Sequence, residues 1–173
     1  MRIDSVKAMD QLQVRRLDAD EWPALRDVRL RALQDSPDAF ASSHIEEVDR
    51  PESWWIDGMA RLAWFVTEAD GRIVGLVAGM PLGGDRREVI SMWVDPAHRG
   101  TGVADRLLDA VVAWAKAEGA TGLCLAVAED NPRARHFYER AGFIPSGPGE
   151  SLRSRPDVCT TEMRLEFAAP PVR

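Results

Sequence analysis

The stretch VDPAHRGTGVADRLL, residues 94–108, joins two segments of different hydrophobic periodicity. Before it, REVISMWV (87–94) is rich in β-branched and apolar residues, which is typical of a strand. After it, apolar side chains recur along one face of an amphipathic helix expected over residues 103–117. The strand therefore connects to the helix through a short turn that contains Arg99 and two glycines.

This turn is either a plain tight connection or a cradle for phosphate. The first N–H groups of a helix lack internal acceptors and carry the positive end of the helix dipole. Small residues let a diphosphate approach them, and each hydrogen bond to a charged group contributes about 1.5–3 kcal/mol. The pattern Arg99-x-x-Gly102-x-Ala104 fits that use. It is not the dinucleotide fingerprint GxGxxG, because Asp105 occupies the third glycine position, and the chain has no Walker sequence.

Length and composition predict one globular domain. The chain has 173 residues, of which 45% are apolar and 29% charged. A net charge of −6 without a basic stripe argues against a nucleic-acid partner. The first residues lack an apolar signal core, and no run approaches the roughly 18 apolar residues of a membrane span. We therefore expect a cytoplasmic protein with no membrane partner.

The cysteines and histidines give little support for a disulfide or a metal site. Cys124 and Cys159 each lie in an apolar, strand-like run, and we expect two buried thiols rather than a disulfide or a metal pair. His44, His98 and His136 show no ligand spacing, so no metal is expected.

Periodicity and turn residues predict a mixed α/β domain over residues 12–168, with residues 1–11 disordered and 169–173 a loose tail. The expected elements are a strand at 12–17, a helix at 21–33, an acidic segment with two short helices at 38–59, strands at 62–69, 72–82 and 87–94, the helix at 103–117, a strand at 123–128, a short helix at 132–141, a short strand after Gly142, a polar loop at 145–157 and a last strand at 158–167.

Three local signals refine this prediction. Asp70–Gly71 is a strong hairpin signal between the second and third strands. Gly119 is the natural end of the long helix. The run at 123–128 is apolar throughout, which indicates a strand buried on both faces and parallel to its predecessor.

A second motif follows that buried strand. Residues 128–143, AEDNPRARHFYERAGF, contain Asn131-x-x-Ala134-x-x-Phe137-Tyr138 and then Gly142–Phe143. Together with MWVDP and HRGTGVADRLL, this motif resembles the GCN5-related N-acetyltransferase (GNAT) superfamily, the acetyl-coenzyme A-dependent amine acetyltransferases. The element order matches over nearly the whole chain. The resemblance implies one domain with a central, splayed, mixed β-sheet flanked by helices.

The resemblance also implies a cofactor site between two splayed parallel strands, here 87–94 and 123–128, with the diphosphate on the turn amides. Val94 N–H would polarise the thioester carbonyl. Asn131 also suits a helix N-cap ahead of Pro132. The implied cofactor-binding residues are Trp93, Val94, Arg99, Gly100, Thr101, Gly102, Val103, Ala104, Asn131, Ala134, Phe137 and Tyr138. Ala97 occupies the alternative family position for a Gln or Arg.

The implied reaction needs a base and an acid. A lysine-like amine, with a pKa of about 10.4, must lose a proton before it attacks the thioester, and the departing sulfur gains one. Tyr138, the only tyrosine, falls at the family's proton-donor position. Glu88 is the best candidate for the base. Glu46 and Glu47 are rival bases or surface charges. The structural alternatives are a core aromatic for Tyr138 and a solvated strand end for Glu88.

We therefore expect an acetyl-CoA-dependent N-acetyltransferase that acts on a primary amine by direct attack in a ternary complex. Neither cysteine has a cue for activation, which argues against a covalent acyl-enzyme. The alternatives are a non-catalytic acyl-CoA sensor or scaffold and, less favoured, O-acyl transfer or a longer acyl donor. The acceptor would be a small-molecule or protein amine, and the acidic residues between Asp35 and Glu52 are compatible with a cationic one. Family members are often dimers, so a homodimer is a further expectation.

Overall fold

The structure is a computed structural model that describes residues 12–168. The segments expected to be loose, 1–11 and 169–173, lie outside the described residues. The elements are β1 (Gln13–Arg16), α2 (Trp22–Asp35), the 3-10 helix η1 (Pro37–Ala39), α3 (His44–Glu47), α4 (Glu52–Arg61), β2 (Ala63–Ala69), β3 (Arg72–Pro81), β4 (Arg86–Val94), the 3-10 helix η2 (Pro96–His98), α5 (Val103–Ala117), β5 (Gly122–Ala128), α6 (Pro132–Arg140), β6 (Ile144–Gly149) and β7 (Thr160–Glu166).

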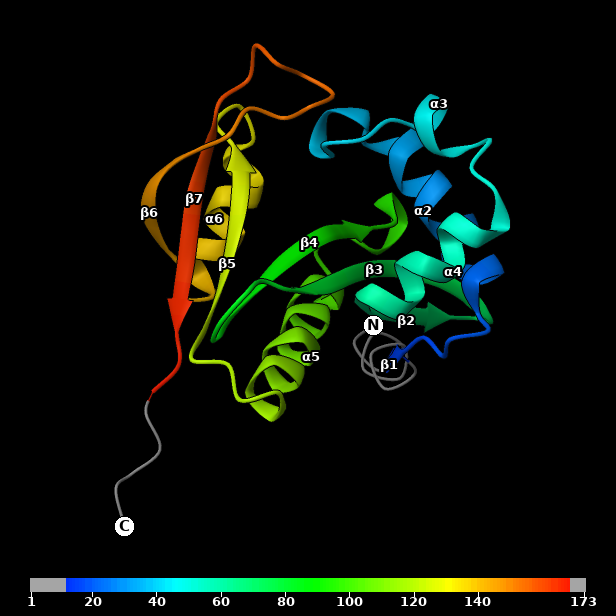
Figure 1. The fold of residues 1–173 in the computed structure, drawn as a ribbon, viewed down its shortest axis with the longest axis horizontal. Coiled ribbons are helices and arrows are strands. Elements are labelled where there is room, and N and C mark those ends of the chain that lie inside the picture. Colours follow the sequence, from blue (N-terminus) through cyan, green and yellow to red (C-terminus); the bar gives the residue numbers. More distant parts are fainter. Residues whose placement is uncertain (1–11, 169–173) are drawn as a thin grey trace, which may run out of the picture.

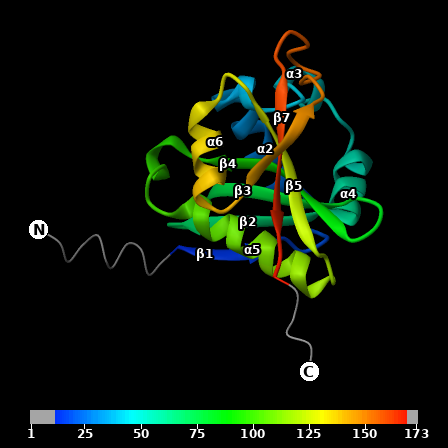
Figure 2. The same ribbon diagram turned by 90° about the vertical axis from the view of Figure 1, so that its left-hand side faces the viewer.

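The strands form one seven-stranded sheet in the order β1-β2-β3-β4-β5-β7-β6. Neighbouring strands are antiparallel except β4 and β5, which are parallel. In Figure 1 the strands β5, β6 and β7 run upright on the left, at a steep angle to β2, β3 and β4. Figure 2 shows the same angle from the β5 side. The predicted mixed sheet and the parallel β4–β5 pair are confirmed.

β4 and β5 pair only at their first residues. Arg86–Glu88 pairs with Gly122–Cys124, and in the described part of the chain the ladder ends there. Farther along β4, Ser91 and Met92 together stand opposite Val77 of β3, which makes a β-bulge with Ser91 at φ 59°. A bulge bends and twists its strand, so β4 turns away from β5 and the sheet opens between them.

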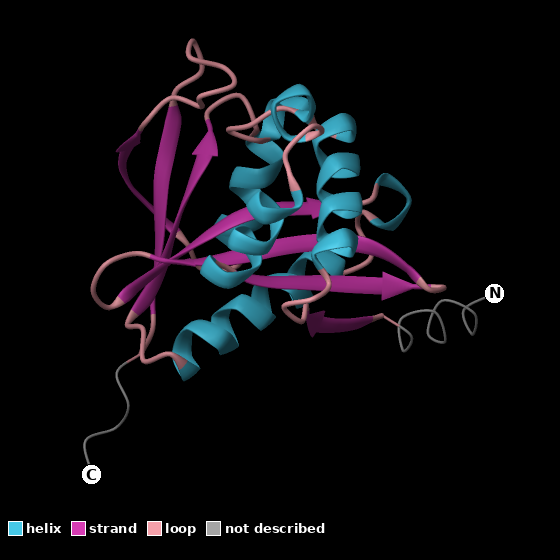
Figure 3. Ribbon diagram, turned by 45° about the vertical axis from the view of Figure 1, so that its right-hand side comes forward, coloured by secondary structure: helices cyan, strands magenta, loops and turns pink. Residues whose placement is uncertain are grey.

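The two faces of the sheet carry separate apolar cores. α5 and α6 cover one face, where Leu107, Val111 and Tyr138 pack among strand side chains. α2 and α4 cover the other, where Leu25 and Trp55 are buried. Figure 3 shows most of the helices crowded against the β2–β4 half of the sheet. Burying each such aliphatic side chain stabilises the fold by about 1.5–3 kcal/mol, so both helix layers are firmly attached.

Local signals set the ends of several elements. α5 has the bounds predicted from its periodicity, and the chain leaves it through Gly119 at φ 74°. At the β2–β3 hairpin Asp70 and Gly71 both have positive φ, 51° and 74°, as a two-residue hairpin turn requires. Pro51 is the N-cap of α4 rather than part of it.

Three expectations are wrong. The short strand predicted after Gly142 forms as β6, but it extends to Gly149, into residues expected in the polar loop. Its Pro145 and Pro148 are tolerated because β6 is an outer strand that pairs only with β7. Cys159 is exposed before β7 and Cys124 is half-buried, so the thiols, both free, are not both buried. Ala126 of β5 is exposed because it faces an open cleft instead of a helix.

Candidate active site

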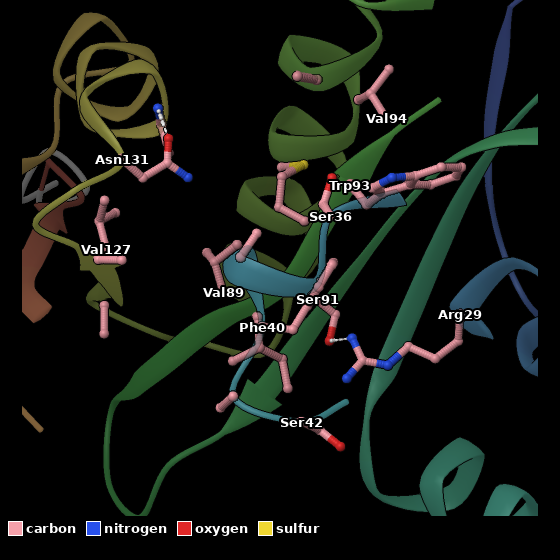
Figure 4. Close-up of a pocket in the computed structure, with 18 of the residues that line it drawn as sticks. Arg29, Ser36, Phe40, Ser42, Val89, Ser91, Trp93, Val94, Val127 and Asn131 are labelled. Atoms are coloured by element: carbon pink, nitrogen blue, oxygen red, sulfur yellow. Dashed lines mark hydrogen bonds between the residues drawn. The ribbon is translucent and has the colours of Figure 1, made fainter. Parts of the chain in front are cut away.

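A cleft of about 960 Å³ lies where β4 and β5 separate. Its walls come from the strand ends, the turn before α5, helix α6, and the helices α2 to α4 on the opposite side. Figure 4 shows side chains from these elements, among them Val89, Val127, Asn131 and Phe40, around one open space. The cleft therefore joins the turn and the second motif, which are far apart in the sequence.

The edge of β4 presents an unpaired amide to this cleft. Val94 stands opposite Gly75 in the antiparallel ladder, and the next residue, Asp95, donates its N–H to Val74 C=O at 2.8 Å. Because hydrogen-bonding direction alternates along an antiparallel strand, the N–H of Val94 points away from β3. That side faces β5, whose ladder with β4 has already ended. Val94 N–H is thus available to an acyl group in the cleft.

The turn before α5 adds a run of free amides. Within the described residues, the N–H groups of residues 100–105 have neither a backbone nor a side-chain acceptor, whereas Arg99 N–H donates to Pro96 C=O at 3.4 Å. Gly100 and Gly102 have φ 76° and 85°, which glycine adopts without a steric penalty. Successive amides in this conformation form an anion-binding concavity at the start of a helix.

The Arg99 side chain is directed elsewhere. Its guanidinium donates to the carboxylate of Asp35 and, through Nε, to Val94 C=O at 2.9 Å. Asp35 also accepts from the Trp93 indole N–H at 2.9 Å. Arg99 therefore connects the turn to the end of α2, and its guanidinium is already engaged by protein acceptors.

Helix α6 supplies the remaining residues of the predicted cofactor wall. Asn131 Oδ1 accepts from Ala134 N–H at 3.0 Å and so caps the helix. The side-chain amide nitrogen of Asn131 points toward the cleft in Figure 4, so the cap leaves a donor free. Ala134, Phe137 and Tyr138 also line the cleft.

Tyr138 has an apolar environment. Its ring packs edge-on against Phe137 and Phe143, with centroids 5.0 and 5.5 Å away. Burial raises the pKa of Tyr138 well above the ordinary value for a phenol. The hydroxyl therefore stays protonated at neutral pH, as a proton donor must.

Glu88 lies at the junction where β4 and β5 separate, opposite Cys124 of β5. Burial, with a smaller contribution from Glu162, raises the pKa of Glu88 above that of a free glutamate. A carboxylate of raised pKa is a stronger base than an exposed one.

Glu88 and Tyr138 approach the opening from opposite faces of the sheet. Side chains alternate along a strand, and Val89 packs in the core under α5 while Ile90 packs with the core under α2. Glu88 therefore shares the α2 face with Ile90, whereas Tyr138 belongs to the α5 core. A base and an acid on opposite sides of the opening suit a reaction in which one molecule enters and another leaves.

Glu47 is neither a surface charge nor a free base. Its two carboxylate oxygens accept from Arg29 Nε at 3.0 Å and Nη2 at 2.8 Å, and the side chain is 4% exposed. Arg29 also donates through Nη1 to Ser91 Oγ at 3.2 Å, a bond drawn in Figure 4. Glu46 is exposed and forms a capping box with Ser43. Glu46 and Glu47 thus both accept hydrogen bonds from other groups of the protein, which leaves Glu88 as the candidate base.

The cleft brings together most of the residues predicted from the sequence. Thr101 and Val103 do not line it: Thr101 Oγ1 donates to His98 C=O at 2.6 Å, and Val103 is 1% exposed in the core. Those that line it are Glu88, Trp93, Val94, Arg99, Gly100, Gly102, Ala104, Asn131, Ala134, Phe137 and Tyr138.

Sequence reasoning missed Arg29 and Ser91. The helix period of α2 placed Arg29 next to the buried Val28 and Leu33, but a single arginine near an apolar face is usually solvated. No local signal marks Ser91, because the bulge depends on the partner strand. In residues 12–168 no cluster of three metal-ligand side chains occurs, and no helix there is long and apolar enough to cross a bilayer.

The splayed sheet and its cleft agree with the class of protein that comparison with known proteins shows, an acyltransferase. A family model described as "Acetyltransferase (GNAT) family" matches residues 22–143. The chain belongs to the GNAT family, and the resemblance seen in its two motifs is confirmed.

Individual relatives agree with this assignment. An uncharacterized N-acetyltransferase of Mycobacterium tuberculosis (strain H37Rv) is 36% identical over 142 residues, 75% of this chain and 85% of the relative. A GNAT acetyltransferase of Streptococcus pneumoniae has a similar structure, with a TM-score of 0.75 at 16% identity over 91% of this chain and 99% of the other. YncA of Salmonella typhimurium, whose structure contains acetyl-CoA, has a TM-score of 0.71 at 20% identity over 94% and 99% of the two chains. At such identities the two structures support the fold alone.

Proposed function

We propose that this protein transfers the acetyl group of acetyl-CoA to a primary amine by direct attack in a ternary complex. The observation that carries the proposal is the free N–H of Val94 at the opened edge of β4, in the same cleft as the unpartnered amides of residues 100–105. The turn amides suit a diphosphate and the strand edge suits an acylated arm. The donor set therefore fits acetyl-CoA, which is also present in the YncA structure.

Each residue has a distinct task. The turn amides hold the diphosphate, and Asn131 donates to the arm that crosses the cleft. Val94 N–H donates to the acyl oxygen as negative charge develops there, which is the largest single source of stabilisation in many acyl transfers. These groups are held by the main chain of the sheet and of α5, so they need little reorganisation when the substrate binds.

Proton transfers by Glu88 and Tyr138 complete the reaction. Glu88 accepts a proton from the incoming ammonium group, directly or through water. The amine nitrogen then forms a bond to the acyl carbon, and the carbon–sulfur bond breaks. Tyr138 gives its proton to the departing sulfur and is reprotonated, through water, by the second proton that the amine nitrogen loses. The proton held by Glu88 is released to solvent, so the products are the amide, the free thiol and one proton. A phenol and an alkyl thiol have similar ordinary pKa values. Burial raises the pKa of Tyr138, and the same apolar surroundings disfavour the departing thiolate, so the proton transfer between them stays feasible.

The test combines binding with turnover. Calorimetry should detect uptake of acetyl-CoA, and an amine panel should release free thiol in step with acetylated product. Uptake without thiol release from any amine would favour the alternative, an acyl-CoA sensor. An absence of uptake by folded protein would refute both. A longer acyl donor would be recognised by a higher kcat/KM with propionyl- or butyryl-CoA than with acetyl-CoA.

A further inference from the structure

Two carboxylates of the acidic segment, Asp35 and Glu47, are neutralised within the protein. Asp35 is bound by Arg99 and by the Trp93 indole, and Glu47 forms its buried pair with Arg29. Glu46 accepts from the N–H of Ser43 and from its hydroxyl. Asp35 and Glu47 are therefore neutralised by arginines, whereas Glu46 keeps its negative charge. The segment is acidic in sequence, yet it does not give the cleft an acidic wall.

Three arginines on the same side of the cleft have no such partner. Arg50 precedes α4, Arg61 ends α4, and Arg153 lies in the loop between β6 and β7; all three are exposed and line the cleft. Within residues 12–168 no carboxylate oxygen lies within 4 Å of their guanidinium groups. They form the only uncompensated charges that this wall presents at the mouth, apart from Glu46.

Two of these arginines converge on one place. Arg50 Nε donates to Glu46 C=O at 3.0 Å, and its guanidinium lies 5.5 Å from the Trp54 ring centroid. Arg153 reaches the same place from the loop between β6 and β7, which is held against the acidic segment where Ser154 donates to Phe40 C=O and Arg155 donates to Asp38 C=O at 3.1 Å. Arg50, Arg153 and Glu46 all line the cleft, so two guanidinium groups and one carboxylate leave a net positive charge at its mouth.

The deeper part of the acceptor side has the opposite charge. Glu88 lies at the β4–β5 junction, and the Arg29–Glu47 pair, which contacts Ser91 farther along β4, is neutral overall. Aromatic side chains form the rest of this wall, namely Phe40, Trp54, Trp55 and Trp64. An occupant that fits would carry an amine toward Glu88, an apolar body along the aromatic wall and an anion at the mouth.

We infer that the acceptor is an amine that also carries a carboxylate, which Arg50 and Arg153 bind at the mouth of the cleft. This inference rests on the proposed N-acetyltransferase function and names its substrate class. A polyamine, which has a cation at each end, would place one of them against these arginines. Guanidinium groups bind carboxylates through paired N–H donors, so the site would also restrict the orientation of the acceptor.

The experiment compares amines that differ only in the carboxylate: L-lysine with cadaverine, and L-tryptophan with tryptamine. Binding to the protein saturated with coenzyme A is measured by calorimetry, and kcat/KM with acetyl-CoA is measured in parallel. We expect the carboxylated member of at least one pair to bind about ten-fold more tightly, the effect of one charged hydrogen bond. If neither carboxylated amine binds more tightly than its partner, the inference is wrong.

Substitutions test whether Arg50 and Arg153 cause the preference for carboxylated amines. In Arg50→Gln/Arg153→Gln the ratio of the two affinities should fall about ten-fold, whereas Arg72→Gln, an exposed arginine of β3 outside the cleft, should leave it unchanged. Arg153→Glu alone should turn the preference toward the decarboxylated amine, and it provides the test if the double variant does not fold. A preference that survives in these variants would contradict the inference.

Binding and turnover, measured separately, distinguish a failure of this inference from a failure of the proposed N-acetyltransferase function. Preferential binding of carboxylated amines without any acetylation would contradict the proposed reaction and leave the anion site supported. Efficient acetylation of cadaverine and tryptamine in preference to their partners would support the reaction and refute the anion site.

Discussion

Arg99 donates a hydrogen bond to the carboxylate of Asp35, although 64 positions separate the two residues in the sequence. Asp35 ends α2, on the acceptor side, and Arg99 stands in the turn that leads to α5. Arg99 also holds the carbonyl of Val94, whose N–H faces the cleft. One arginine thus connects the end of α2, the end of β4 and the turn before α5.

Removing this connection should impair catalysis more than stability. Both side chains are partly exposed, so we expect Arg99→Gln or Asp35→Asn to cost no more than about 1 kcal/mol in the free energy of unfolding. We expect kcat/KM for acetyl-CoA to fall about ten-fold in each, because the end of β4 is less well fixed. The double variant should lose no more than the worse single one, since both act through the same contact. Strictly additive losses in steady-state kinetics would argue against the coupling.

Tyr138→Phe tests the proton donor. The ring retains its packing against Phe137 and Phe143, so the melting temperature should stay close to that of the parent protein. Loss of a general acid typically lowers the rate by about 100- to 10,000-fold, and we expect kcat to fall within that range. The affinity for acetyl-CoA, measured by calorimetry, should be retained. An unchanged kcat would assign the proton donor to another group.

The pH dependence tests Glu88. Burial raises its pKa, and the base must be ionised to act, so kcat/KM should rise with pH through a pKa above the ordinary glutamate range. Glu88→Gln should lower the rate and remove this acidic limb of the profile. A limb that persists in the variant would show that a different group titrates.

The thermal stability of a Glu88 variant provides an independent test of the raised pKa of Glu88. A carboxyl whose pKa is raised on folding stabilises the folded state below its unfolded pKa and loses that contribution as the pH rises through the folded pKa. At neutral pH the ionised Glu88 is therefore unfavourable in the fold. We expect Glu88→Gln to melt at the same or a higher temperature than the parent at pH 7. A clear fall would mean that Glu88 is held by favourable contacts and is not poised as a base.

Gly102→Ala tests the diphosphate cradle. Gly102 has φ 85°, and an alanine in the left-handed region costs about 1–2 kcal/mol. The turn should relax and misalign its amides, which we expect to weaken acetyl-CoA binding about ten-fold in calorimetry, as loss of one charged hydrogen bond would. Gly83→Ala is a matched control, because Gly83 lies in an open turn and is not among the positive-φ glycines. Equal affinities in the two variants would count against the cradle.

The buried pair of Arg29 and Glu47 should matter mainly for stability. Glu47→Gln leaves the Arg29 charge buried without its partner, a change that costs about 3–5 kcal/mol in the free energy of unfolding. The double variant Arg29→Met/Glu47→Leu removes both charges and should lose less stability, relative to the parent protein, than Glu47→Gln does. Denaturant titration of the three proteins measures the differences. If the double variant were the least stable, the pair would be a net source of stability.

The sequence predicted those features that depend on neighbouring residues. The bounds of α5 follow from its 3.6-residue period, and the β2–β3 turn follows from Asp70–Gly71, because both are local conformational preferences. Most of the residues named from the two motifs line the cleft, since the side-chain types and spacing of a motif are set within short segments. The turn before α5 is another such local feature, because the positive φ values of Gly100 and Gly102 belong to the turn itself and do not depend on distant residues.

The tertiary structure decided which distant groups meet. Arg29 and Glu47 form a neutral pair, and Arg99 is bound to Asp35 instead of pointing at a phosphate. β6 forms in a proline-containing segment because an outer strand needs ladder bonds on one side only. Charge composition cannot reveal such pairings, because an ion pair depends on the distance between side chains, and that distance exists only after the sheet and its two helix layers have packed. For the same reason an acidic segment can border a cleft whose mouth is positively charged.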